Sequence, residues 1–345
     1  MIEQLNKKQK RRFLIICSVA FLITVSVFFS ALMFGKYGTF SLYETFKMLF
    51  NTFGASFEIE NSKQKVFQYI RLPRTIASFL IGSALSCSGM VYQNTFNNKL
   101  VSPDILGVSS GCCVGAGIAL LFEQNQVIVS VSAFLCGCIA VLISLLLPKL
   151  FKNMSSVSMV LSGIIVGAFM NSVVALLKYI ADKNDKLSEI TFWMMGSVSG
   201  TTIKEIGFVF PLIFLSIIIL FSMNWKIDVI SLGQEEAYSL GIHYKKNRFI
   251  IIVCATFLTA SAVSISGNVG WVGLVIPHIA RSLAGYSSKY CIPITILCGG
   301  SFMMSVDLLS RIISTDELPL SVITGFFGAL IYTVILAKKG KELNV

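Results

Sequence analysis

The sequence predicts an all-α integral membrane protein with about ten transmembrane helices. Of its 345 residues, 55% are hydrophobic and 13% are charged, which is far more apolar than a soluble domain of this length. Apolar runs near the roughly 18 to 20 residues that cross a bilayer recur along nearly the whole chain. We therefore expect residues 1–345 to form a single transmembrane domain.

The candidate spans follow one another with short connections. The first comes after a basic cluster at residues 7–12, and its length and lack of a small-residue cleavage site predict a retained helix rather than a signal peptide. The expected spans cover residues 13–34, 72–92, 105–122, 127–148, 157–178, 206–223, 248–268, 271–286, 291–309 and 318–337.

The charge distribution predicts the orientation of the chain. Its formal net charge is +11. The basic cluster at residues 7–12 places the N-terminus inside, and an even number of spans then places the C-terminus, with lysines between residues 338 and 341, inside as well. Because this orientation accounts for the excess positive charge, we expect no nucleic-acid partner.

The longest strongly polar connection, from about Asn224 to Arg248, is predicted to be cytoplasmic. Helix-forming residues from Gln234 to Leu240 lie between Gly233 and Gly241, which predicts a short helix with flexible ends at the membrane surface. Such a segment could dock a partner protein, or it could be an ordinary solvated connection.

Small and polar residues suggest a route through the membrane. The second span is rich in serine and glycine, which allow close helix packing and also line polar pathways. It leads into a polar turn over residues 93–104, and non-helical backbone at membrane depth needs protein or a water-filled cavity to satisfy it. A later glycine-rich turn precedes a span that proline should kink. Our candidates for the pathway or its gate are Ser86, Gly89, Gln93, Asn98, Pro103, Gly107, Gly273 and Pro277.

The block at residues 84–89 is echoed at residues 262–267, five spans later. Because an odd offset reverses the direction of crossing, this pattern suggests an inverted repeat of the kind found in transporters. Chance similarity between two small-residue helices is the alternative explanation.

Arginines flank a proline at the predicted outer end of the second span. Arg71 and Arg74 could face outward and bind carboxylates of an external partner, or they could anchor the helix by snorkelling. Asp307 and Arg311, four residues apart, could pair on one helix face. Residues 35–69, between the first two spans, could contain an interfacial helix around Tyr43 and Phe46.

The sequence offers few residues for bound metals or for catalysis. Its nine cysteines lie mostly in apolar runs without a CxxC pair, so we interpret them as small buried residues and expect no metal site, disulfide or cofactor. We find no catalytic constellation and no GxxxxGK[ST] phosphate loop, so we expect neither an enzyme nor a chain that hydrolyses ATP by itself.

In combination, several motifs resemble those of the FecCD family, the permease subunits of bacterial ABC importers for iron-siderophore complexes, haem and cobalamin. The matching segments extend through most of the chain and include RLPR at 71–74, WMMG at 193–196, the pattern from Leu232 to Gly241, GLVIPHIAR at 273–281, DLLSR at 307–311 and ELP at 317–319.

The resemblance implies a type II ABC importer permease fold with ten helices, located in the bacterial cytoplasmic membrane as a dimer with the pathway between subunits. The implied partners are a separate ATPase, an extracytoplasmic substrate-binding protein, a second permease subunit that is identical or paralogous, and an iron chelate as substrate. The arginines that match the family's docking points are Arg71, Arg74 and Arg311. The residues that match its coupling segment are Gly233, Glu235, Ala237, Leu240 and Gly241.

Two alternative hypotheses for the function remain open. A haem or cobalamin permease would share the same motifs. An ion-coupled secondary transporter would normally need ionisable residues inside the membrane, whereas most carboxylates here fall in connections. ATP-independent, proton-dependent uptake would favour this last alternative.

Overall fold

The computed structural model describes residues 2–150, 155–183, 185–314 and 316–343, and the secondary structure assigned in these residues is helical. Seven helices are long and apolar enough to cross a membrane, and three shorter apolar helices complete the set of ten predicted spans. The ten are α1 (Ile2–Met33), α4 (Leu72–Thr95), α5 (Val108–Leu121), α6 (Gln126–Leu150), α7 (Ser156–Ile180), α9 (Ile203–Ser222), α12 (Tyr244–Ser266), α13 (Val272–Ala284), α14 (Ser288–Ile313) and α15 (Leu320–Leu343).

Shorter helices lie in the connections. They are α2 (Leu42–Thr52), α3 (Asn61–Val66), a π-helical turn (Phe67–Arg71), α8 (Lys186–Met195), α10 (Asn224–Ile230) and α11 (Gln234–Ser239). The sequence did not predict α3 or the π-helical turn, because both precede the apolar run of the second span.

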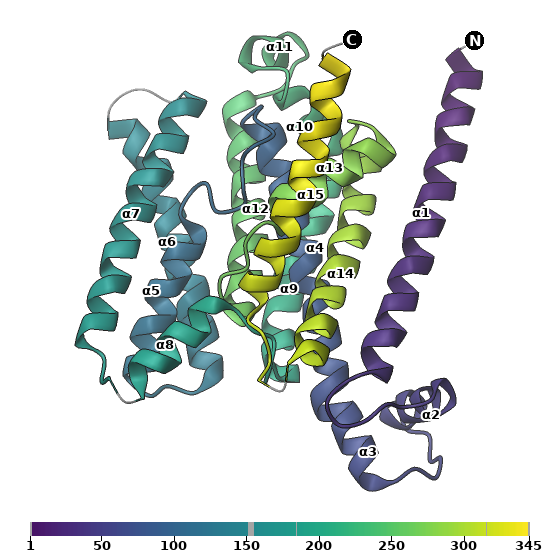
Figure 1. The fold of residues 1–345 in the computed structure, drawn as a ribbon. Coiled ribbons are helices and arrows are strands. Elements are labelled where there is room, and N and C mark those ends of the chain that lie inside the picture. Colours follow the sequence, from purple (N-terminus) through teal and green to yellow (C-terminus); the bar gives the residue numbers. More distant parts are fainter. Residues whose placement is uncertain (1, 151–154, 184, 315, 344–345) are drawn as a thin grey trace.

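Helices α4 and α12 form the centre of the bundle. In their most apolar stretches, 89% and 78% of the residues are buried, against 6% for α1, which stands at the rim beside α14 (Figure 1). Helices α5, α6, α7 and α8 gather on the other side of this centre (Figure 1). The small residues of α4 allow this central position, because they let neighbouring backbones approach closely.

Glycines mark the two closest crossings of α4. A Cβ atom at Gly82 would overlap the carbonyl group of Gly299 on α14, and a Cβ at Gly89 would overlap that of Gly273 on α13. The packing interpretation of these small residues is therefore confirmed at both crossings.

Replacing Gly89 with alanine is expected to destabilise the chain by about 1 to 3 kcal/mol or more, because the added methyl group forces two helix backbones apart. The same change at Gly207 on α9 is the matched control. A Cβ there would meet nothing within 4 Å, so G207A should leave stability unchanged or raise it by up to about 1 kcal/mol. Thermal unfolding in detergent measures both variants, and equal midpoints would contradict the close crossing.

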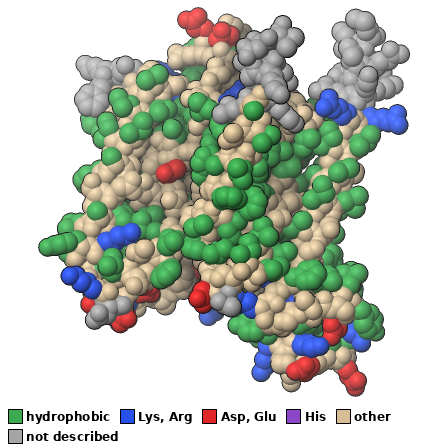
Figure 2. All heavy atoms as spheres, viewed as in Figure 1, with side chains coloured by type: hydrophobic (Ala, Val, Ile, Leu, Met, Phe, Trp, Pro, Cys, Tyr) green, Lys and Arg blue, Asp and Glu red, His purple; other side chains and the backbone are tan. Residues whose placement is uncertain are grey.

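The two ends of the bundle carry different structures. At one end are the start of α1, the end of α15 and helix α11. At the other end are α2, α3 and α8 (Figure 1). On the face shown in Figure 2, most charged side chains lie toward the two ends and hydrophobic side chains cover the middle. This pattern is the one expected of a membrane-spanning bundle. Lys10, Arg11 and Arg12 are exposed, and the side chains of residues 7, 8 and 338–341 lie outside the described residues.

The blocks that suggested an inverted repeat lie on antiparallel helices. Helix α4 begins at the end of the bundle that carries α3, and α12 begins at the end that carries α11 (Figure 1). Residues 84–89 and 262–267 therefore cross the bundle in opposite directions, as the odd offset predicts.

The predicted interfacial helix is present as α2. Ser41 and Glu44 form a capping box at its start, in which each side chain bonds the other residue's backbone N–H. Tyr43 and Phe46 are exposed, as expected of a helix that rests in an interface, whereas Met48 is fully buried against the bundle. Lys63 Nζ of α3 lies 2.8 Å from Glu44 Oε1 and joins the two short helices.

This ion pair should make the α2 segment sensitive to acid. The hydrogen bond from Lys63, with those from Ser41, lowers the pKa of Glu44 from 4.5 to about 2. Because the folded-state pKa lies below the unfolded value, the stabilisation is complete above about pH 4.5 and is lost as the pH falls toward 2. Hydrogen-exchange protection of residues 42–52 should decrease in this window, and E44Q should abolish the dependence. E58Q, which changes an exposed carboxylate nearby, is the control and should retain it.

Candidate functional site

A break in the helical structure lies at the centre of the bundle. The connection from Phe96 to Gly107 descends from the end of α4 to the start of the short helix α5, and Gly267–Trp271 joins α12 to the short helix α13 (Figure 1). The two connections come together at the start of α13, where a Cβ atom at Gly273 would overlap the Pro103 ring. Between them is a cavity of about 310 Å³, lined by Leu85, Ser102, Pro103, Asp104, Ser109, Thr259, Asn268, Val269, Gly270, Trp271, Gly273 and Leu274.

Polar side chains satisfy the broken backbone. Gln93 Nε2 donates a hydrogen bond to the carbonyl oxygen of Val101 at 3.1 Å, and Arg281 Nη1 donates to Gln93 Oε1 at 2.7 Å. Asp104 Oδ1 accepts from the N–H of Ser109 at 2.7 Å, in the first turn of α5. The expectation that protein groups satisfy non-helical backbone at membrane depth is met by these contacts.

The predicted pathway residues divide into two groups. The structure brings Gly89, Pro103 and Gly273 together at the crossing of α4 and α13, and Gln93 lies one turn away with its side chain buried. Gly107 has a φ of 77°, in the left-handed region that favours glycine, and α5 begins directly after it. The three remaining candidates lie outside this cluster. Ser86 is buried and donates a hydrogen bond to the Gly82 carbonyl oxygen, and Pro277 is buried within α13. Asn98 is exposed toward the α11 end.

A polar face of α7 was missed by the sequence analysis. Gly163, Gly167 and Asn171 follow one another at four-residue intervals and line a hollow of about 400 Å³ shared with Asp104 and Ser110. Asn171 and Ser172 are exposed near the middle of this span. An amide facing lipid at that depth would be costly, so this face suits a second subunit or a water-filled path. The four-residue spacing of small residues was the available signal.

The predicted docking arginines are buried. Arg71 is 1% exposed, and its guanidinium donates to the carbonyl oxygens of Leu32 and Met33, at the end of α1, and of Gly38. These contacts place a cation at the C-terminus of a helix, where it is stabilising. The guanidinium also lies 3.9 Å from the centre of the Phe40 ring. The π-helical turn at Phe67–Arg71 carries Arg71 to this position.

Arg74 and Arg311 share one buried carboxylate. Arg74 Nε donates to Asp307 Oδ1 at 2.7 Å and its Nη1 donates to Glu317 Oε1 at 2.9 Å, while Arg311 Nη2 lies 3.2 Å from Asp307 Oδ2. The predicted pairing of Asp307 with Arg311 is thus confirmed. The expected outward-facing pair of Arg71 and Arg74 is wrong for this conformation, because both guanidinium groups bind acceptors of their own chain.

A hollow at the same end of the bundle leaves Arg311 in contact with the outside. It has a volume of about 430 Å³ and none of its lining residues is acidic. The lining consists of Phe34, Gly35, Lys36, Thr39, Arg311, Ile312, Ile313 and Ser314.

The polar segment at the opposite end contains the predicted short helix. Helix α11 (Gln234–Ser239) lies between Gly233 and Gly241, whose φ angles of 128° and 75° require glycine-like backbone conformations. Ala237 is fully buried and holds the helix against its neighbours. Leu240 is 51% exposed and Glu235 is also exposed, so both are accessible to a partner.

Cysteine and histidine form no evident binding site in the part of the chain that the structure describes. The nine cysteines are free thiols there, and no group of three His, Cys, Asp or Glu side chains could hold a metal ion.

Comparisons with known proteins agree on one family. The model of the FecCD transport family matches residues 22–338. The molybdate import system permease protein MolB of Haemophilus influenzae is 35% identical over 281 residues, covering 81% of this chain and 83% of that protein. A probable iron chelatin transport system permease protein of Helicobacter pylori is 34% identical over 267 residues, covering 77% and 81%.

A solved structure extends the similarity to the fold. It shows a transporter assigned to the metal-chelate type of ABC transporters, in an inward-facing conformation. Its TM-score is 0.84 at 33% sequence identity, and the match covers 94% of this chain and 99% of that one.

Proposed function

The chain belongs to the FecCD transport family and is a membrane permease subunit of an ABC importer, and from this premise we propose that it carries an iron(III) chelate inward. A separate ATPase supplies the driving force and an extracytoplasmic binding protein delivers the substrate. Ten helices with non-helical backbone at their centre support this assignment, because interrupted helices of this kind are typical of transport pathways.

The observation that carries the choice of substrate is the similarity to the Helicobacter pylori iron chelatin permease over four fifths of that protein. The Haemophilus influenzae molybdate permease is about as similar, so molybdate is the second candidate. Both are cargoes that a binding protein can deliver to the same kind of path.

Transport by the assembled importer distinguishes these substrates. The permease is isolated from its native membrane with its co-purifying chains and reconstituted in vesicles containing ATP. We expect uptake of a radiolabelled ferric siderophore that depends on ATP and on the binding protein. Uptake of molybdate, haem or cobalamin without the iron chelate would replace the proposed substrate, and proton-driven uptake without ATP would contradict an ABC mechanism.

The proposed pathway runs beside the central break, between this chain and a second permease subunit. The exposed face of α7 around Asn171 and the hollow it shares with Asp104 support this position. In a dimer, the polar groups of this face would meet water or the partner rather than lipid. Gly89, Pro103 and Gly273 then act as the fixed packing around which the path opens.

The proposed docking surface for the binding protein is the hollow next to Arg311. Lys36 and Arg311 line it; Arg311 is paired with the buried Asp307, whereas Lys36, whose side chain is 33% exposed and lies 3.9 Å from Glu317 Oε1, suits an acidic side chain of the partner. Arg71 and Arg74 support this surface from within. Glutamate at Arg74 would place a new carboxylate beside Asp307, and glutamate at Arg71 would face the carbonyl oxygens of Leu32 and Met33, so the test of docking requires a residue outside these buried contacts.

Replacing Lys36 with glutamine is therefore expected to weaken the binding protein's affinity about fivefold, because one rim charge is lost. K47Q on α2 removes another charge at the same end and should leave the affinity unchanged. Titration of the binding protein against the reconstituted permease measures both. Unaltered affinity of K36Q would place docking elsewhere.

The proposed ATPase contact is α11 with its flanking glycines. Exposed Glu235 and Leu240 face the partner, while buried Ala237 transmits the movement to the bundle. Gly233 and Gly241 allow the sharp turns at the two ends of this helix. In this proposal, both chain ends and the ATPase lie on the cytoplasmic side.

A further inference from the structure

Another hollow lies near the α11 end of the bundle, between α6, α7 and α12. Its volume is about 380 Å³. Apolar side chains from all three helices form its floor and basic side chains surround them, and none of its lining residues is acidic. The lining consists of Leu145, Lys149, Met159, Gln234, Tyr244, Lys245, Lys246, Arg248, Phe249 and Ile252.

Arg248 is the unusual residue of this hollow. It is 5% exposed, yet among the described residues it makes no ion pair with a carboxylate. Its Nη2 donates to Ser156 Oγ at 2.9 Å, and its Nε has no hydrogen-bond partner in the part of the chain that is described. A buried cation with an unsatisfied donor is costly, so the site favours an added anion.

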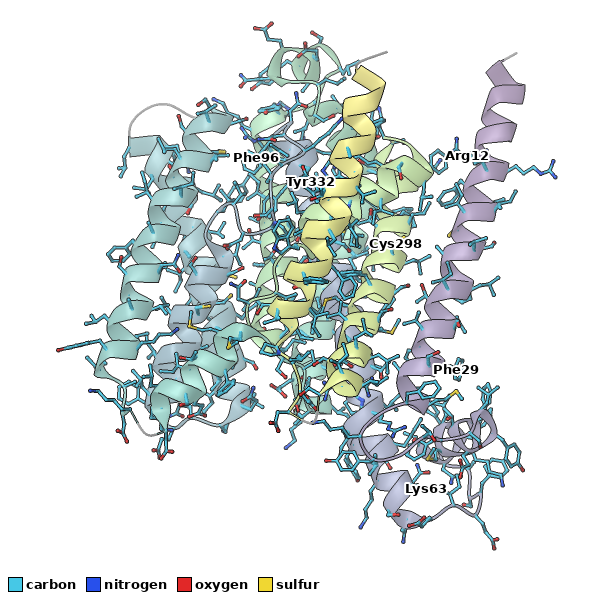
Figure 3. All side chains as sticks on the ribbon, viewed as in Figure 1. Arg12, Phe29, Lys63, Phe96, Cys298 and Tyr332 are labelled. Carbon is cyan, nitrogen blue, oxygen red and sulfur yellow. The ribbon has the colours of Figure 1, made fainter. Side chains whose placement is uncertain are left out.

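Aromatic rings support the guanidinium without neutralising it. Its carbon lies 5.3 Å from the centre of the Phe96 ring and 5.6 Å from that of Tyr244. Figure 3 shows Phe96 near the upper end of the bundle, between α6 and α12. These contacts hold Arg248 in place and leave its positive charge available to a ligand.

The position and lining of the hollow indicate the ligand. Lys149 is in the last turn of α6, Met159 is in the first turn of α7, and Tyr244 begins α12. The hollow therefore lies where membrane helices end, at the level of lipid headgroups. A phosphate would neutralise the basic rim, and an acyl chain would cover the floor of Leu145 and Ile252.

We propose that this hollow binds an anionic phospholipid, such as phosphatidylglycerol, with the phosphate at Arg248 and the rim lysines. The proposal rests on the orientation given under the proposed function, in which this end faces the cytoplasmic leaflet. Gln234, the first residue of α11, lines the same hollow. Lipid occupancy would thus steady the coupling segment against α6, α7 and α12.

Lipid retention by the purified, full-length permease tests the proposal. The protein is equilibrated in detergent micelles containing equal amounts of phosphatidylglycerol and phosphatidylcholine, and retained lipids are measured by native mass spectrometry. We expect preferential retention of phosphatidylglycerol, reduced about tenfold or more in K245Q/K246Q because two charges near the headgroup are lost. R11Q/R12Q removes two exposed charges from α1 and should retain the lipid normally.

A second variant tests the buried cation directly. R248Q should lose the preference for phosphatidylglycerol, whereas R248K, which keeps the charge, should preserve most of it. If R248Q fails to fold, the K245Q/K246Q variant provides the test instead. Equal retention by K245Q/K246Q and the unchanged protein would overturn the proposal, as would displacement of the lipid by glycerol 3-phosphate.

The remaining outcome separates lipid from protein. If K245Q/K246Q lost the co-purifying ATPase while retaining phosphatidylglycerol, the rim would be an ATPase contact and the lipid proposal would fail. Because this assay measures binding without transport, its result does not depend on which substrate the importer carries.

Discussion

Replacing Asp307 with asparagine is expected to lower the free energy of unfolding by about 3 to 5 kcal/mol, the largest stability effect that we predict. The carboxylate is fully buried and lies within 3.2 Å of guanidinium nitrogens of both Arg74 and Arg311. Its removal leaves two buried cations with Glu317 as the remaining carboxylate nearby. Thermal unfolding of the purified permease in detergent measures the loss.

The neighbouring carboxylate provides the control. Asp316 is exposed, so D316N should change the stability by less than about 0.5 kcal/mol. E317Q should have an intermediate effect on stability. Glu317 is partly exposed, and of the two arginines that pair with Asp307 it pairs only with Arg74. A loss below about 1 kcal/mol in D307N would show that water or Glu317 compensates the two cations.

Replacing Leu240 with glutamate is expected to reduce ATP-dependent uptake more than tenfold while leaving the fold intact. The side chain is 51% exposed and lies directly after α11, so the change would remove the apolar contact that we propose with the ATPase and would bury little charge inside the permease. A tenfold loss corresponds to about 1.4 kcal/mol, which lies within the range for a side chain at the centre of an interface. Uptake in vesicles and recovery of the ATPase on co-purification measure the effect.

Two further variants separate coupling from folding. L240M keeps the apolar surface and should transport normally. A237E, in contrast, places a charge at a fully buried position and should lower the melting temperature as well as uptake. Normal uptake by L240E would show that Leu240 is not part of the coupling contact, and α11 would then be interpreted as a solvated connection.

The membrane helices were predictable because each rests on a local signal. An apolar run has to be long enough to cross the bilayer, and all ten runs are helical; α1 is the largest departure, because it begins at Ile2 rather than at the predicted residue 13. Helix α11 was predictable for a similar reason, since Gly233 and Gly241 mark its ends within the sequence itself. The same holds for Asp307 and Arg311, four residues apart on one helix.

The buried contacts of the arginines were not predictable from local signals. Arg74 and Glu317 are 243 positions apart, and nothing near either residue indicates that the ends of α4 and α14 meet there. An arginine at the end of an apolar run looks exposed in the sequence, and whether it snorkels, docks a partner or caps α1 depends on tertiary packing. The same limit concealed the Nε of Arg248, which has no hydrogen-bond partner among the described residues.

The short helices α5 and α13 have a consequence for how the protein enters its membrane. With 14 and 13 residues, they extend about 20 Å, less than the roughly 30 Å of a hydrocarbon core. The non-helical residues at their starts would expose unpaired backbone to lipid if either helix were inserted alone. During biosynthesis, each must therefore wait in the translocon, or at the surface, until a neighbouring long helix can receive it, so insertion should proceed in groups of helices rather than one helix at a time.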